Sequence, residues 1–168
     1  MMDMIQLSVP GKDPQAFPKG TSAKDALLKL RGFRSKEMFA VKVNGVERDL
    51  VAAVDEDATL EPLTFDSPEG KEVYRHSSTH IMAQAVKECF PTAKMTIGPA
   101  IENGFFYDFA FERPFTPEDL EKIEAQALEI IQRNLPVSRR EFSKEAAIEF
   151  FNNLGETYKV ELIQGFPD

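Results

Sequence analysis

The chain has 168 residues, 42% hydrophobic and 29% charged, which is typical of a globular protein with one large or two small domains. A single Cys excludes an internal disulfide, and a net charge of −8 argues against binding nucleic acid by bulk charge. No apolar run is long enough to cross a bilayer, and the N-terminal residues lack the basic flank and apolar stretch of a signal peptide.

The first 65 residues are rich in strand signals. Apolar side chains alternate over residues 4–9, "QAF" fits a return strand, and a helix begins after Thr21 or Ser22, either of which can cap it. Asn44-Gly45 predicts a hairpin turn, and residues 58–65 predict a last strand. A strand pair, a helix and further strands in this length predict a small mixed sheet crossed by one helix, the β-grasp outline.

The segment "FDSPEG" predicts the boundary between two domains. Ser67 can cap a helix that has Pro68 at its first position, and this helix is expected to end at about Cys89, before Phe90-Pro91. The expected division is a β-grasp domain over residues 1–65 and an α+β domain over residues 66–168.

The second domain is predicted to contain an antiparallel sheet and helices. Asn103-Gly104 predicts a hairpin, and aromatic residues alternate over 105–111, among them Tyr107. A helix capped by Thr116 is expected over residues 117–134, followed by a strand over 135–142. A short helix capped by Ser143 and a final strand over "ETYKVELI" complete the prediction, and the domain is expected to be C-terminally incomplete.

The only two histidines, His76 and His80, lie four residues apart in "RHSSTH" and so share one side of the predicted helix. They fall opposite its expected core face, beside Ala83 and Lys87. That core face comprises Tyr74, Ser78, Ile81, Met82, Ala85 and Cys89. Two interpretations stay open at this point: a shared site for a metal or substrate, or two exposed polar side chains on a solvated face.

A metal site needs more donors than this pair offers. Structural zinc takes about four N or S ligands and catalytic zinc about three plus water. Cys89 is expected on the other side of the helix, and no Glu lies inside the His-x-x-x-His. We therefore expect no tightly bound zinc. If a zinc ion is present, His76 and His80 are its expected ligands.

Four segments together resemble the N-terminal part of threonyl-tRNA synthetases. They are "RHSSTHIMAQAVKECFP", "KMTIGPAIENGFFYDF", "TPEDLEKIE" and "GETYKVELI". The resemblance covers essentially the whole chain. It implies that residues 1–65 form a TGS domain of the β-grasp, ubiquitin-like type, and that residues 66–168 form the first part of the second additional, or editing, domain.

The resemblance implies a hydrolytic site for seryl-tRNA that was mischarged on threonine tRNA. Its residues here are His76, His80, Tyr107 and Lys159, while the family's later Cys-x-x-x-His has no counterpart in the 168 residues. The ligase domain is likewise not represented, so ATP, magnesium and zinc are implied only for the full-length parent, and no cofactor is expected in this fragment. Whether the fragment alone is an enzyme stays open.

The resemblance also implies a cytoplasmic protein whose second domain binds the 3′ aminoacyl end of tRNA, rather than DNA or a membrane. The ligand of the first domain is not indicated. Two alternatives remain: a free-standing zinc-dependent hydrolase of the alanyl-tRNA-editing type, or a non-catalytic RNA- or protein-binding module. Without the resemblance, Lys159 reads as a solvated charge and Tyr107 as part of an aromatic core.

Overall fold

The structure is a computed structural model that describes residues 3–31 and 34–167. It is a mixed α+β protein, as predicted. The chain divides into two compact units, Met1–Tyr74 and Arg75–Asp168, and the division falls within helix α2 (Pro68–Cys89). Within the described ranges, no helix is both long enough and apolar enough to cross a membrane.

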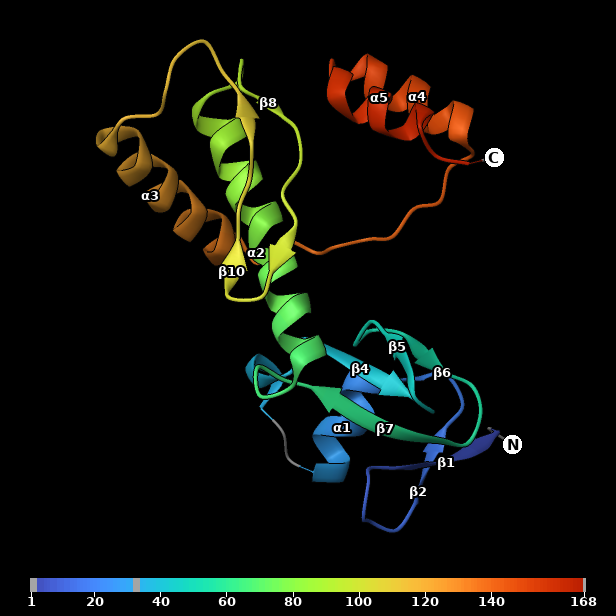
Figure 1. Ribbon diagram of the computed structural model, residues 1–168. Helices are drawn as coiled ribbons and strands as arrows, with labels where there is room; N and C mark the ends of the chain where they lie inside the picture. Colours follow the sequence, from blue (N-terminus) through green and yellow to red (C-terminus); the bar gives the residue numbers. More distant parts are fainter. Residues whose placement is uncertain (1–2, 32–33, 168) are drawn as a thin grey trace. The chain divides into compact units, whose positions relative to one another are not determined.

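The first unit contains a five-stranded sheet with the order β2-β1-β7-β4-β5 (Figure 1). Its strands are β1 (Met4–Ser8), β2 (Gln15–Pro18), β4 (Ala40–Val43), β5 (Val46–Arg48) and β7 (Ala58–Leu63). β1 and β7 are parallel and the other neighbours are antiparallel, which gives the predicted mixed sheet. The remaining elements of this unit are β3 (Thr21–Ser22), β6 (Ala53–Val54), α1 (Ala23–Arg31) and the 3₁₀ turn η1 (Ser35–Glu37).

The alternation of apolar side chains over residues 4–9 determines which residues of this strand enter the core of the sheet. Ile5, Leu7 and Val9 are buried, and helix α1, capped by Ser22, covers the sheet with its own apolar side (Figure 1). The hairpin turn between β4 and β5 has Asn44 at φ 50° and Gly45 at φ 82°. Two successive left-handed residues match the right-handed twist of a two-residue hairpin, so the Asn-Gly signal is confirmed.

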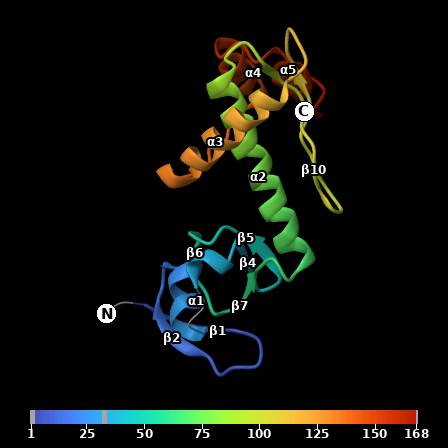
Figure 2. The ribbon, with the colours of Figure 1, turned by 90° about the vertical axis from the view of Figure 1, so that its left-hand side faces the viewer.

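The second unit is built around α2 and α3 (Pro117–Arg133), which lie side by side in both views (Figures 1 and 2). Its buried cluster is Ala85, Val86, Ala93, Ile123 and Ile130. The other elements are β8 (Lys94–Met95), β9 (Ala100–Ile101), β10 (Gly104–Phe105), β11 (Phe109–Ala110), α4 (Lys144–Asn153) and α5 (Thr157–Gln164). β9 pairs with β10 in the predicted hairpin, and β8 pairs with β11, both antiparallel.

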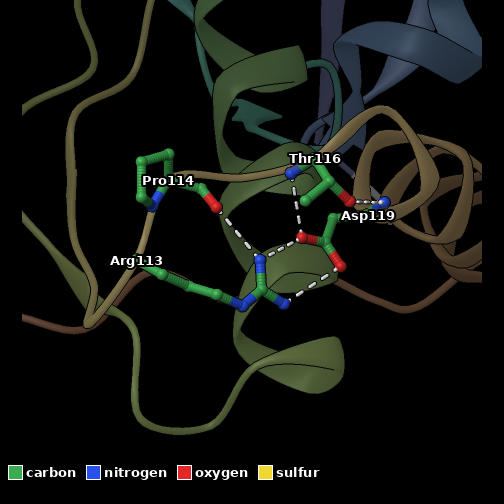
Figure 3. Close-up of polar contacts among 4 residues, drawn as sticks. All are labelled: Arg113, Pro114, Thr116 and Asp119. Atoms are coloured by element: carbon green, nitrogen blue, oxygen red, sulfur yellow. Dashed lines mark hydrogen bonds and ion pairs between the residues drawn. The ribbon is translucent and has the colours of Figure 1, made fainter.

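The start of α3 is fixed by a polar cluster (Figure 3). The Thr116 hydroxyl accepts the Asp119 amide N–H at 3.3 Å, and the Asp119 carboxylate accepts the Thr116 amide N–H at 3.0 Å. This reciprocal capping box confirms the predicted cap. The buried Asp119 also forms an ion pair with Arg113, which donates to the carbonyl of Pro114 at 3.0 Å.

Two predicted strands are wrong. Residues 135–142 have no strand, and the segment predicted as the final strand forms helix α5. Thr157, Tyr158 and Val160 favour strands as single residues, but Glu156 and Val160 are buried four residues apart, which is a helical spacing. α5 packs against α4, and Gly155 at φ 71° allows the short turn between them.

The predicted core face of α2 is also partly wrong. Tyr74 is 47% exposed, whereas Ala83, which was placed on the solvent side, is 4% exposed. The buried positions are Thr79, Ala83, Ala85 and Val86. More than one element contacts α2: α3 supplies Ile123 and Ile130 to its core, and α5 forms an ion pair with it. A helix that packs against several elements buries small residues on more than one side. A prediction that assumes a single buried face places some of these residues in solvent.

Candidate functional site

His76 and His80 are exposed and contact each other. Their Nε2 atoms are 3.1 Å apart and their ring centroids 4.8 Å apart. A hydrogen bond between two ring nitrogens needs an unprotonated acceptor, so at least one ring must be neutral. Between them the buried Thr79 donates its hydroxyl to the His76 carbonyl at 2.7 Å, which keeps the hydroxyl satisfied inside the unit.

His80 is in an environment that favours its neutral form. Burial lowers the pKa of its imidazole below the ordinary 6.5, and the neighbouring charges of His76 and Lys159 lower it further. Lys159 is half-buried on α5 and not on a strand as predicted, and its positive charge contributes to the lowered His80 pKa. A neutral imidazole can accept a proton near neutral pH.

Tyr107 is a half-buried residue between β10 and β11. Its ring stacks on Phe109 with centroids 4.8 Å apart, and a Cβ at Gly98 would lie 2.0 Å from a ring carbon. Gly98 therefore leaves the space that the ring occupies. Burial raises the pKa of Tyr107, and the negative charge of Glu156 raises it further, so the hydroxyl stays protonated and can donate.

Tyr107 also lines an apolar cleft of about 280 Å³ between α2, α3 and the β10–β11 segment. The cleft wall is formed by Met82, Val86, Phe105, Phe106, Tyr107, Phe109, Phe115, Leu120 and Ile123. The histidines do not line this cleft. Its wall carries no imidazole, carboxylate or ammonium group.

Two residues around the site were missed from the sequence. Glu156 is buried, and its carboxylate forms an ion pair with Lys87 of α2 at 2.9 Å. The strand prediction hid the role of Glu156, because a strand places residues three apart, such as Glu156 and Lys159, on opposite faces. At the start of a helix, residues three apart share a side. The spacing of Glu156, Val160 and Ile163 carried the helical signal.

Of the four predicted site residues, the structure brings His76 and His80 into contact, and it places Lys159 on helix α5, which begins after its N-cap Glu156. Lys159 acts on His80, and Glu156, one turn earlier, acts on Tyr107. Arg75 holds the β9–β10 hairpin to the histidine helix by donating to the carbonyls of Ile101 and Glu102. That all four residues line one open cleft stays a prediction.

The residues do not fit a resident zinc ion. His76 and His80 supply two donors, and among residues 3–31 and 34–167 no group of three or more His, Cys, Asp or Glu is arranged to hold a metal. Cys89 points its Sγ to the Lys122 carbonyl, at 3.8 Å, and not to the histidines.

Sequence comparison finds similarity over the whole chain to proteins named threonine–tRNA ligase. The protein of Symbiobacterium thermophilum is 45% identical over 168 residues, which are 100% of this chain and 26% of that protein. That of Carboxydothermus hydrogenoformans is 44% identical over 165 residues, and that of Acidithiobacillus ferrooxidans is 52% identical over 133 residues. The chain spans about a quarter of the length of these curated relatives. No protein-family model matches it.

Proposed function

We propose that this chain, which fits as an N-terminal fragment of a threonine–tRNA ligase, combines a TGS domain with the first part of an editing domain. Residues 1–65 are assigned to the TGS domain and residues 66–168 to the editing domain. The second domain serves to hydrolyse seryl-tRNA that was mischarged on threonine tRNA. The observation that carries this proposal is the exposed histidine pair, whose Nε2 atoms are 3.1 Å apart, with the pKa of His80 lowered so that its neutral form is favoured.

The chemistry needs few groups because an aminoacyl ester is already labile. A water molecule attacks the ester carbonyl carbon while a neutral imidazole of the pair accepts its proton. The Lys159 ammonium stabilises the oxyanion that develops on the carbonyl oxygen. The bond between that carbon and the ribose oxygen then breaks, the ribose oxygen takes the proton back from the imidazolium, and free serine leaves.

Tyr107 is assigned to substrate recognition. One side of its ring is taken by Phe109, and a Cβ added at Gly98 would collide with the ring. This packing favours a role for its hydroxyl over stacking on adenine. A protonated phenol donates a hydrogen bond to the serine hydroxyl or to the tRNA terminus.

The parent's other partners follow from the same relationship. We assign ATP, magnesium and zinc to the ligase reaction of the parent, and tRNA to the editing domain. We assign the parent to the cytoplasm, where translation takes place. The ligand of the first domain is not assigned, because none of its described contacts indicates one.

The test uses the full-length parent. His76→Ala and His80→Ala are each expected to abolish deacylation of seryl-tRNA, because the imidazole pair accepts the proton of the attacking water. Threonine activation with ATP is expected to stay unchanged, because that reaction belongs to a separate domain. Ser77→Ala, an exposed change on the same helical turn, is the matched control. Normal deacylation by both histidine variants would refute the proposal.

A further inference from the structure

We infer that the first unit serves as an anchor for helix α2, and that this anchor orders the histidine-bearing turn, residues 75–80. The inference rests on the proposed function in treating the two histidines as working groups, but the contacts that carry it do not depend on the reaction. The effect travels along the backbone of α2, which begins at Pro68 in the first unit and continues past Tyr74 into the second.

The start of α2 packs against the end of the sheet at a buried glycine. Gly70 is buried, and a Cβ added there would collide with the carbonyl group of Thr64, the residue directly after β7. The Ser67 hydroxyl joins the same two segments, because it donates to the Thr64 carbonyl at 3.2 Å and accepts the Gly70 amide N–H at 3.0 Å. Only a residue without a side chain allows this approach, so the first turn of α2 is held close to the sheet.

Two side-chain contacts extend this anchor along the helix. Lys42 of β4 places its Nζ 2.7 Å from the Glu69 carboxylate. Farther along the helix, the centroid of the Tyr74 ring lies 5.0 Å from that of Phe39 and 5.3 Å from that of Phe65. All of these residues belong to the first unit, whose last residue is Tyr74. The anchor therefore ends directly before the histidine-bearing turn.

The histidine-bearing turn has little helical preference of its own. Its sequence, "RHSSTH", consists mostly of Ser, Thr and His, which are weaker helix formers than Ala, Leu or Lys. The Thr79 hydroxyl donates to the His76 carbonyl, a bond that competes with the helical hydrogen bonds of the backbone. His76, Ser77 and His80 are also exposed. Because starting a helix is costly and extending one is not, such a segment stays helical mainly by continuing an ordered neighbour.

The backbone of α2 makes this turn depend on the first unit. An α-helix pairs each amide N–H with the carbonyl four residues earlier, so the amides of residues 75–78 pair with the carbonyls of residues 71–74. Those carbonyls belong to the anchored part of the helix. The second unit holds α2 from the other side, through its buried core and through Arg75, which donates to the β9–β10 hairpin. Loss of the anchor therefore unwinds α2 up to this turn and leaves residues 86–89 helical.

The test is hydrogen exchange of single amides, read by NMR in the 168-residue chain with a chelator present. Gly70→Ala pushes the first turn of α2 away from Thr64. It is expected to speed exchange at residues 75–78 by about tenfold, while residues 86–89 keep their rates. Ala favours the helix more than Gly does, so faster exchange has the opposite sign to the helix preference of the new residue.

Lys42→Met tests the anchor from outside the helix. Loss of the ion pair with Glu69 is expected to speed exchange at residues 75–78 by about threefold. Lys42→Arg keeps the pair and is expected to exchange like the wild type. Arg34→Met is the matched control, because it removes a surface ion pair of the same unit, with Glu37, that involves no residue of α2. Its exchange rates at residues 75–78 are expected to stay unchanged.

The amides of β1 report whether Gly70→Ala unfolds the whole first unit. The expectation for residues 75–78 is then the same, because the anchor is lost altogether. Unchanged or slower exchange at these residues in Gly70→Ala would overturn the inference, and so would an equal acceleration at residues 86–89. The measurement needs no tRNA, so its failure is distinguishable from a failure of the deacylation experiment.

Discussion

At the scale of single residues, the histidine pair combines exposure with a partner that limits its protonation. The Nε2 atoms are 3.1 Å apart, and Lys159 adds a positive charge near His80. Both features oppose the imidazolium form of His80. The pair therefore differs from two solvated histidines, although neither ring is buried in the core.

The first prediction concerns the pH dependence of stability. The folded-state pKa of His80 is lowered, so between that pKa and about 6.5 the unfolded chain binds more protons. The stabilisation due to neutral His80 is complete above about pH 6.5 and is lost as the pH falls through the folded-state pKa. We expect the melting temperature of His80→Gln to rise relative to that of the wild type as the pH is lowered from about 7 to about 5.

Thermal unfolding of both proteins across that range measures the difference. Ser77→Ala, which removes no titratable group, is expected to keep a constant offset from the wild type. A His80→Gln offset that also stays constant with pH would mean that folding does not perturb the His80 pKa.

The second prediction concerns the cost of removing the rings. Because both side chains are exposed, His76→Ala and His80→Ala are each expected to cost well under the ~2–5 kcal/mol of an emptied core position. Denaturant unfolding of the 168-residue chain measures this. Leu60→Ala, at a fully buried position, is the comparison that should reach that range. A histidine variant that matched it would identify a structural role.

At the scale of elements, the N-terminus of α3 shows how a short polar motif orients a helix. Arg113 and Asp119 connect the preceding loop to the first turn (Figure 3). The Arg113 guanidinium also lies 5.4 Å from the Phe111 ring centroid. The hydrogen bonds and charge of Arg113 hold the pKa of Asp119 well below its usual range, and the Thr116 amide adds to this effect. The loop and the helix are thereby fixed as one structure.

The third prediction concerns this cap. Thr116→Ala is expected to destabilise the chain by about 1 kcal/mol, since the Asp119 amide loses its hydroxyl acceptor and keeps only the Thr116 carbonyl. Asp119→Asn is expected to cost more, because the ion pair is lost as well. Hydrogen exchange of α3 amides measures both effects, with the exposed Glu121→Gln as control. Equal protection in all three variants would contradict the role of the capping box.

The elements also show where local pattern was sufficient. α3 carries a cap, a first-position proline and an acidic first turn, and these local signals agreed with the fold, whereas Leu120 and Ile131 of its apolar stripe are exposed. In α5 the signals conflicted, since strand-forming residues occupy a segment whose buried positions follow a helical period. In the structure this segment is a helix that packs against α4, with Glu156 paired to Lys87 of α2.

At the scale of the whole chain, each unit has its own buried cluster. The first is centred on residues such as Leu7, Leu27 and Leu60, and the second on Ala85, Val86 and Ile123. The sequence placed a boundary between residues 65 and 66, and the compact units meet after Tyr74, within α2. The assignment of these units to a TGS and an editing domain stays a proposal.

The fourth prediction concerns zinc in the chain as a whole. With two histidine donors and no third ligand arranged beside them among the described residues, we expect no stoichiometric zinc after purification without a metal-binding tag. Elemental analysis at near-equimolar zinc measures this. Retention of one zinc per chain, lost in His76→Ala, would show that the pair does bind metal and would favour the zinc-dependent alternative.

The sequence by itself determined the features that depend on short-range chemistry. The Asn44-Gly45 turn, the caps of α3 and α4, and the exposed placement of His76 and His80 all follow from preferences within a few residues. The resemblance to threonyl-tRNA synthetases likewise came from contiguous motifs, and the relatives agree with it.

Only the tertiary structure decided which residues meet across the second unit. The helical state of α5, the buried Glu156 and its partner Lys87 depend on contacts between segments about 70 residues apart. No local preference encodes such a contact, because the free energy of burying a charge depends on what the rest of the chain places beside it. The helical state of α5 also sets the position of Lys159, which the strand prediction had placed differently.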